Sequence, residues 1–102
     1  MSKYLFLYRG PAVDGPPEAD TMTAWTVWME KVGAALVDPG APAGNRTAVA
    51  GDGSTRSASD TNGYSVVQAD SLDSARALLD GHPFLTAGDA AFGIDVLELL
   101  EM

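Results

Sequence analysis

The sequence contains no cysteine, a single histidine and only six lysine and arginine residues in 102. Without cysteine the chain forms no disulfide, no thiolate metal site and no cysteine nucleophile, a composition that fits a reducing compartment. One histidine among scattered carboxylates does not make a metal site. We therefore predict neither a metal nor another cofactor.

The chain has six basic residues against fourteen acidic ones, so its net charge is −8. Such a chain repels the phosphates of nucleic acids and anionic lipid headgroups, so we expect no nucleic-acid partner. No apolar run approaches the ~18 residues of a membrane span, and the first ten residues do not read as a signal peptide. We expect a cytoplasmic protein without a membrane partner, folded as a single domain over residues 1–102.

The first half of the chain predicts a strand, a helix and a second strand. The strand predicted at residues 3–9 contains a continuous apolar and aromatic run, Tyr4 to Tyr8, which is typical of a strand covered on both faces. A helix then begins after Pro16-Pro17 and ends at Gly33, and its apolar stripe comprises Met22, Trp25, Met29 and Val32, widened by Trp28. We expect the second strand at residues 34–37, broken at Asp38-Pro39-Gly40 because proline donates no ladder hydrogen bond.

The second half predicts two more strands and a helix. Residues 41–62 form either a short strand at 47–50 with a hairpin turn at 51–54, or a mobile loop. A strand follows at 63–69, and Asp70 or Ser71 then caps a helix that ends at Gly81, with Pro83 preventing its resumption. Its inward residues are predicted to be Leu72, Ala75, Leu78 and Leu79. After a connection over 84–91, alternating apolar residues predict a last strand at 92–100.

This order of elements predicts an α+β fold of the ferredoxin-like βαββαβ type, an antiparallel sheet with two helices on one face. The other face is left uncovered, although the first and last strands carry large apolar residues on both faces. We predict that a second copy covers it, giving a homodimer through the sheet faces. The alternative is a monomer whose own middle segment covers that face.

Four stretches of the chain carry a family resemblance: residues 3–8 (KYLFLY), 25–33 (WTVWMEKVG), 63–72 (GYSVVQADSL) and 81–83 (GHP). In this order they resemble YCII-related proteins of the DGPF type, over essentially the whole chain. The resemblance implies a dimeric α+β barrel, in which two ferredoxin-like subunits face their sheets together and small-molecule pockets lie between sheet and helices. The chain departs from the family at residues 52–55, where Asp-Gly-Ser-Thr replaces Asp-Gly-Pro-Phe.

The second departure concerns a catalytic pair. Some relatives have a histidine in the first helix, paired with an acidic residue on the following strand, but residues 21–33 contain no histidine. His82 is the candidate to replace it, with Asp38 as the acidic partner, because an imidazole exchanges a proton near neutral pH. The alternative is that His82 is a capping and loop-packing residue and that Asp38 forms a turn.

Five further residues are candidates for binding a small aromatic ligand. Trp25 and Trp28 lie three positions apart on one helix, and we expect Trp25 in the core and Trp28 at a pocket or subunit contact. Tyr8 and Tyr64 either supply hydroxyls or are ordinary sheet residues with their polar ends in water. Arg9, at the end of the first strand, would bind an acidic substrate unless it is merely exposed.

These residues are compatible with two functions. The first, implied by analogy to the superfamily, is a cofactor-free enzyme with proton-transfer chemistry of the lyase or isomerase type on an aromatic or polyketide-like metabolite. The second is a non-catalytic binding or regulatory dimer, because the family resemblance implies an association with sigma-factor-type regulators. A titratable group within about 3 Å of a ligand atom would favour the enzyme.

Overall fold

The structure, a computed structural model, describes residues 1–11, 19–86 and 88–101. β1 (Ser2–Arg9) is a central strand of its four-stranded sheet. It pairs antiparallel with β5 (Thr61–Ala69) on one side and with β6 (Gly93–Leu99) on the other. β2 (Leu36–Pro42) pairs antiparallel with β5, so the four-stranded sheet has the order β2-β5-β1-β6. β3 (Ala48–Val49) and β4 (Thr55–Arg56) form a separate two-stranded ladder.

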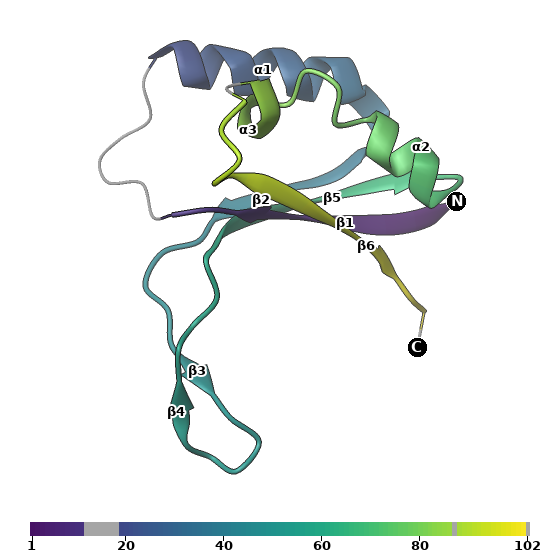
Figure 1. Ribbon diagram of the computed structural model, residues 1–102. Coiled ribbons are helices and arrows are strands. Elements are labelled where there is room, and N and C mark those ends of the chain that lie inside the picture. Colours follow the sequence, from purple (N-terminus) through teal and green to yellow (C-terminus); the bar gives the residue numbers. More distant parts are fainter. Residues whose placement is uncertain (12–18, 87, 102) are drawn as a thin grey trace.

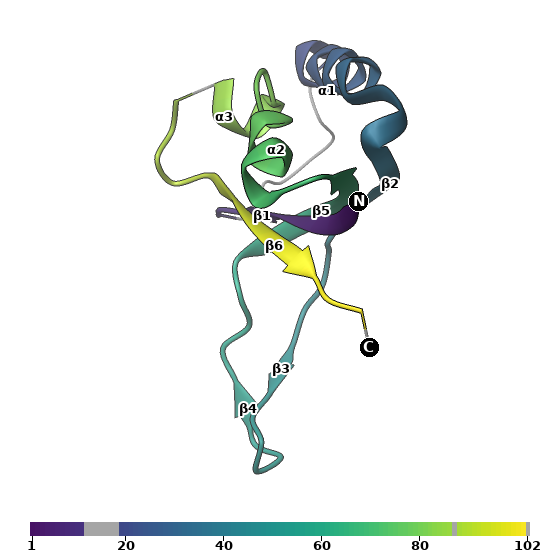
Figure 2. The ribbon, with the colours of Figure 1, turned by 90° about the vertical axis from the view of Figure 1, so that its right-hand side faces the viewer.

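Three helices lie together on one face of this sheet (Figures 1 and 2). They are α1 (Ala19–Val32), α2 (Leu72–Ala77) and α3 (Pro83–Thr86), and a 3₁₀ turn, η1 (Gly33–Ala35), joins α1 to β2. The predicted α+β class with an antiparallel sheet is thereby confirmed. Within the described ranges no helix is both long enough and apolar enough to cross a membrane.

The core lies between the sheet and the helices. Tyr4, Phe6 and Tyr8 of β1 are buried on the helix side, whereas Leu5 and Leu7 are half-buried on the opposite face. The rest of the buried apolar set comes from α1 (Trp28, Val32), β5 (Val67, Ala69) and the α2 segment (Ala75, Leu79). In one copy of the chain β1 is therefore covered on one face only, unlike the predicted strand with two covered faces.

The face of the sheet away from the helices, which we call the open face, is apolar as well. Strand pairing sets Leu5 beside Val66 and Leu97, and Leu7 beside Tyr64. Because paired residues of antiparallel strands point to the same face, these side chains form one surface. The apolar residues of the open face are Leu5, Leu7, Tyr64, Val66, Leu97 and Leu99, of which Tyr64, Leu97 and Leu99 remain exposed. Asp95, which pairs with Leu7, and Lys3, which pairs with Leu99, lie on the same face.

The first helix ends where the sequence predicts, but its buried side is shifted. α1 stops at Val32, and Gly33 follows with φ +59°, a conformation that glycine adopts at little cost. Met22 is exposed, so the buried stripe begins only at Trp25. The predicted roles of the tryptophans are reversed, since Trp28 is fully buried and Trp25 only half-buried. The predicted start signal, Pro16-Pro17, lies outside the described residues.

β2 corrects the prediction that the strand breaks at Asp38-Pro39-Gly40. The strand runs through this tripeptide to Pro42, with shifts in its pairing between Leu36 and Asp38 and again before Ala41. β2 is an edge strand, and bulged edge strands accommodate proline because one row of their backbone groups is unpaired. The shifts in register leave Pro39 and Gly40 without a paired residue on β5, so the strand can pass through the tripeptide.

The middle segment forms a hairpin, as the first of the two predicted alternatives requires. The Ala50 amide donates to the Ser54 carbonyl at 2.7 Å, and the Asp52 carboxylate accepts from the Ser54 amide at 2.9 Å. This hairpin projects from the sheet on the side away from the helices (Figures 1 and 2), and we call residues 43–60 the arm. The projection agrees with a radius of gyration of 14.8 Å, against about 13 Å for a compact domain of this length.

The second helical region differs from the prediction in three details. Ser71 caps α2 by accepting from the Ser74 amide at 3.1 Å, but the helix ends at Ala77 and turns lead to Gly81, with φ +77°. Leu72 points outward and is exposed, so its predicted inward position is wrong. Pro83 does not prevent a helix but begins α3, because the first helical position needs no amide donor.

Gly40 offers a test of the bulged β2 strand. A Cβ at this position would lie 1.7 Å from the Tyr64 carbonyl oxygen, and φ is +75°. We expect Gly40→Ala to lower the free energy of unfolding by more than about 3 kcal/mol, because strain and overlap with backbone add up. Gly33→Ala is the matched control, with φ +59° but no atom within 4 Å, and should cost about 1 kcal/mol. Equal losses in urea unfolding would contradict the described β2–β5 pairing.

Candidate functional site

The only histidine lies at the junction of α2 and α3 with its side chain fully buried. Its backbone amide donates to the Leu79 carbonyl at 2.9 Å, and its Nδ1 accepts from the Phe84 amide at 3.1 Å. The loop itself therefore fixes the imidazole. Since Nδ1 is an acceptor, the hydrogen-bond network assigns the proton of the neutral ring to Nε2.

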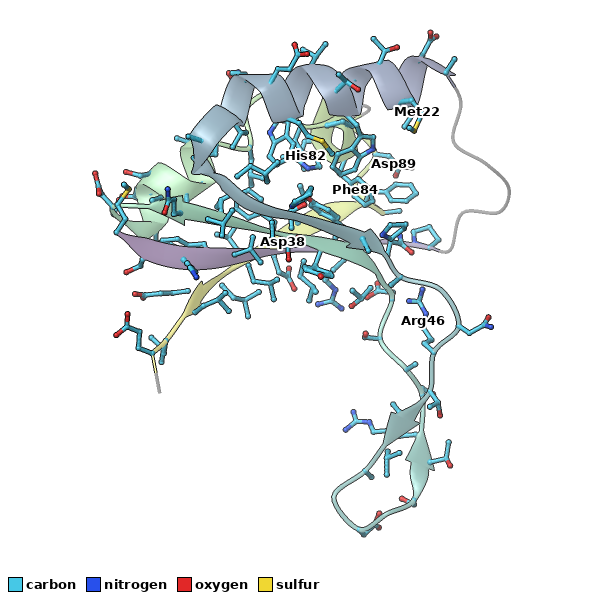
Figure 3. All side chains as sticks on the ribbon, turned by 180° about the vertical axis from the view of Figure 1, so that it is seen from behind. Met22, Asp38, Arg46, His82, Phe84 and Asp89 are labelled. Atoms are coloured by element: carbon cyan, nitrogen blue, oxygen red, sulfur yellow. The ribbon has the colours of Figure 1, made fainter. Side chains whose placement is uncertain are left out.

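Four aromatic rings surround this imidazole, and we call them the aromatic cage. Ring centroids lie 4.4 Å from His82 for Trp28, 4.7 Å for Trp25, 5.0 Å for Tyr8 and 6.0 Å for Phe84. Figure 3 shows His82 between α1 and the sheet, with Phe84 beside it. Residues from β1, α1 and α3 thus converge on one side chain from the loop before α3.

The Nε2 atom of His82 is buried, and none of the described residues accepts a hydrogen bond from it. A buried donor without a partner costs about 1–3 kcal/mol, and the faces of neighbouring aromatic rings are only weak acceptors. Burial lowers the pKa of His82 to about 4, because a charged imidazolium would lose its hydration in the cage. At neutral pH the cage therefore holds an uncharged ring with an unused N–H group.

Two other polar atoms of the cage already have partners. The Tyr8 hydroxyl donates to Ser65 Oγ at 2.5 Å, and Ser65 Oγ donates to the Pro39 carbonyl at 2.8 Å. Burial raises the pKa of Tyr8 to about 12, so its hydroxyl stays protonated. Trp28 Nε1 donates to the Leu78 carbonyl at 2.8 Å. The Tyr8 hydroxyl and the Trp28 indole N–H are thus both held by hydrogen bonds within the protein. The prediction that the polar end of Tyr8 lies in water is wrong.

The remaining predicted site residues lie elsewhere. Arg9 donates to Asp60 at 2.8 Å and to Asp95 at 3.0 Å, so its charge is already compensated. The Asp38 carboxylate accepts from the Gly40 amide at 2.8 Å, as a turn former does. Its pairing with Val66 sets it on the open face, across the sheet from His82. Tyr64 is also on the open face. The chain does not bring His82 and Asp38 together, and their catalytic roles stay predictions.

Sequence reasoning missed two residues of this site, Ser65 and Phe84. Ser65 occupies a buried position in the alternation of β5, where a polar side chain among apolar ones signals a buried hydrogen bond. Phe84 follows Pro83 and was assigned to a connection. Only the formation of α3 directs its ring toward Tyr8, at a centroid distance of 5.1 Å.

A groove lies between α2 and α3, away from the cage. This groove, of about 610 Å³, is lined by Asp73, Arg76, Ala77, Leu79, Asp80, Gly81, Leu85 and Thr86. His82 is not part of its lining, so the groove and the cage are separate places. It is wide open to solvent and bears charges of both signs.

Known proteins add no constraint on this site. Comparisons with protein-family models, with curated proteins and with solved structures find no match to the chain. In the part of the chain that the structure describes, no three histidine or acidic side chains are grouped so that they could hold a metal ion. The chemistry of the site therefore has to be argued from the cage itself.

The pKa of His82 makes the stability of the protein depend on pH. The pKa is about 4 in the folded chain against an ordinary histidine value of 6.5, so the unfolded chain binds the proton first as the pH falls. The stability contributed by neutral His82 is complete above pH 6.5 and is lost between pH 6.5 and 4. We expect the free energy of unfolding to drop by about 2 kcal/mol from pH 7 to pH 5.

Urea unfolding at the two pH values measures this drop. The control is His82→Phe, which keeps an aromatic ring in the cage but has no titrating group, and its stability should change little over this range. Because the chain has one histidine, no other side chain of that type contributes. An equal drop in wild type and His82→Phe would contradict the assignment.

Proposed function

We propose that this chain is a small-molecule-binding homodimer whose aromatic cage accepts a flat carbonyl compound, hydrogen-bonded to Nε2 of His82. The observation that carries the proposal is the buried N–H group without an acceptor. A ligand oxygen would supply the missing acceptor, and the surrounding rings would contact the faces and edges of an aromatic or polyketide-like molecule.

The charge of the cage limits the ligand class. His82 is neutral at pH 7, and Arg9, the predicted cation for an acidic substrate, is engaged by Asp60 and Asp95. Burying a carboxylate without a cation is costly, whereas a ketone, quinone or lactone oxygen carries no net charge. We therefore favour neutral carbonyl compounds over aromatic acids.

The cage is closed in this structure, so ligand binding requires one wall to move. Trp25 and Phe84 are its half-buried members, while Tyr8 and Trp28 are fully buried. Phe84 lies on the four-residue helix α3, which has few hydrogen bonds of its own. We place the entrance between Trp25 and Phe84.

If the bound molecule also reacts, His82 would act as a hydrogen-bond donor. Its Nδ1 is occupied by the Phe84 amide, and its Nε2 carries the proton, so neither nitrogen is available as a base in this tautomer. A donor aimed at a carbonyl oxygen stabilises negative charge that develops there during removal of a neighbouring proton. Proton-transfer chemistry of the lyase or isomerase type would then need a base from the ligand or from water.

The dimer part of the proposal rests on the open face. The strand order β2-β5-β1-β6, with α1 and α2 on one face, is compatible with a ferredoxin-like subunit, and the resemblance to YCII-related proteins implies face-to-face pairing. Tyr64, Leu97 and Leu99 are 38%, 44% and 40% exposed in the single copy. Exposed apolar side chains grouped on one face of a sheet are typical of an interaction surface.

The dimer can be tested with a charge placed on the open face. We expect Leu97→Asp to raise the dimer dissociation constant at least about tenfold, because a carboxylate would be buried against the apolar partner face. Val27→Asp is the control, since Val27 is 60% exposed on α1, on the other side of the molecule. Light scattering over a concentration series measures both. A monomeric wild type at tens of micromolar would contradict the proposal.

The ligand site can be tested by thermal shift with a panel of quinones, aromatic ketones and polyketide-like lactones, with aromatic acids as comparison. A ligand near 100 times its dissociation constant adds about 2.7 kcal/mol, or roughly 10 °C in a domain of this size. We expect neutral carbonyl compounds to stabilise the wild type and His82→Phe to lose the effect. The unliganded variant should stay folded, because it loses both the unpartnered Nε2–H group and the Nδ1 acceptor of the Phe84 amide.

Arg76→Ala serves as the matched control because it alters the outer groove and leaves the cage intact. Ligands lost with Arg76→Ala but kept by His82→Phe would place binding in the groove and contradict the proposal. The single histidine gives a direct readout, since its Nε2–H resonance should shift on binding. A folded dimer that binds none of the compounds would favour the regulatory alternative.

A further inference from the structure

The arm contains a hollow of about 410 Å³ beside the β3–β4 ladder. It is lined from both sides, by residues 46–49 of the segment that leaves the sheet and by residues 56–59 of the segment that returns. Below the ladder, no backbone hydrogen bond among the described residues joins 44–47 to 57–59. The two segments are bridged there by Arg46 Nη1, which donates to the Ser59 carbonyl at 2.9 Å.

Two of the six basic residues of the chain line this hollow. Arg46 belongs to the segment that leaves the sheet and Arg56 to the segment that returns, so the two lie on opposite sides of the hollow. Figure 3 shows Arg46 where the arm leaves the sheet. Both residues are exposed, and none of the ion pairs among the described residues involves either of them. No acidic residue belongs to the described lining.

The two acidic residues of the arm make its overall charge neutral, but they are engaged elsewhere. Asp52 lies at the tip and accepts from the Ser54 amide at 2.9 Å and from the Ser54 hydroxyl at 2.6 Å. These hydrogen bonds lower the pKa of Asp52, and no arginine contributes to the shift. Asp60 accepts from Arg9 at 2.8 Å, which is the main cause of its lowered pKa, whereas Arg46 contributes least. The positive charge at the hollow is therefore local.

We propose that this hollow binds a phosphate group, held between Arg46 and Arg56. A guanidinium group suits this ligand because its planar fork donates paired hydrogen bonds to phosphate oxygens. The hydroxyls of Thr47 and Ser57, which also line the hollow, and the backbone amides that lack a backbone acceptor would supply further donors. The net charge of −8 disfavours long polyanions, so the ligand is free phosphate or the phosphate group of a small metabolite.

A bound phosphate group would also stabilise the arm. The ladder has two residues in each strand, and an isolated two-stranded hairpin is marginal in water even when it is longer. An anion between Arg46 and Arg56 would join the two segments where backbone hydrogen bonds do not. The arm projects on the side of the sheet away from the helices, whereas the aromatic cage lies on the helix side (Figure 1). This site therefore depends neither on the cage nor on the dimer.

Titration of the full chain with inorganic phosphate, followed by NMR in a phosphate-free buffer at constant ionic strength, tests the site. We expect saturable shifts of the backbone amides of residues 46–49 and 56–59, with a dissociation constant in the millimolar range because the site is open to water. Arg56→Gln should weaken binding about tenfold, since it removes a charge-assisted pair of hydrogen bonds. Arg76→Gln on α2 makes the same charge change as a matched control and should leave binding unchanged.

Three results would overturn the proposal: the same shifts with chloride, equal losses of binding in Arg56→Gln and Arg76→Gln, or no saturable shift at tens of millimolar phosphate. Unchanged amide shifts in the four-stranded sheet of Arg56→Gln would show that this variant folds. A second titration with phenyl phosphate distinguishes the sources of the phosphate group. Tighter binding of the ester would assign the site to a phosphorylated metabolite, whereas equal or weaker binding would assign it to the free ion.

Discussion

The packing of Trp28 against His82 is the contact on which the other parts of the molecule depend. The indole ring is fully buried, lies 4.4 Å from the imidazole between centroids, and ties α1 to the end of the α2 segment through Leu78. The same imidazole receives the Phe84 amide and so helps to start α3. One pair of rings therefore sets the positions of all three helices above β1.

This arrangement leaves one buried polar atom without a hydrogen-bond partner, which costs free energy. Nε2 of His82 has no acceptor in the described part of the chain, while the neighbouring Tyr8, Ser65 and Trp28 all have partners. Replacing His82 by an apolar ring would remove this unpartnered donor but would also leave the Phe84 amide without its Nδ1 acceptor. An unpartnered group amid satisfied ones is the kind of local conflict that proteins retain at functional sites.

The two faces of the sheet differ in what they carry. The helix-side face is closed and holds the cage, whereas the open face has exposed apolar residues. The proposed ligand binding and the proposed association would therefore involve different surfaces of the same four strands. β1 links them, since Tyr8 belongs to the cage and Leu7 to the open face.

The sequence by itself determined the strand starting the chain, the helix ending before Gly33 and a helix cap at Asp70 or Ser71, and it offered the turn at residues 51–54 as one of two alternatives. Local rules suffice there, because each depends on residues within one turn or one strand. The continuation of β2 through Pro39, the burial of Trp28 rather than Trp25, and the start of α3 at Pro83 were decided by tertiary structure. Each depends on which neighbour lies opposite, an edge position in the sheet or a ring from a distant segment. For the same reason residues 8, 25, 28 and 84 form a cage around His82 only after folding, while Asp38 and Arg9 find partners elsewhere.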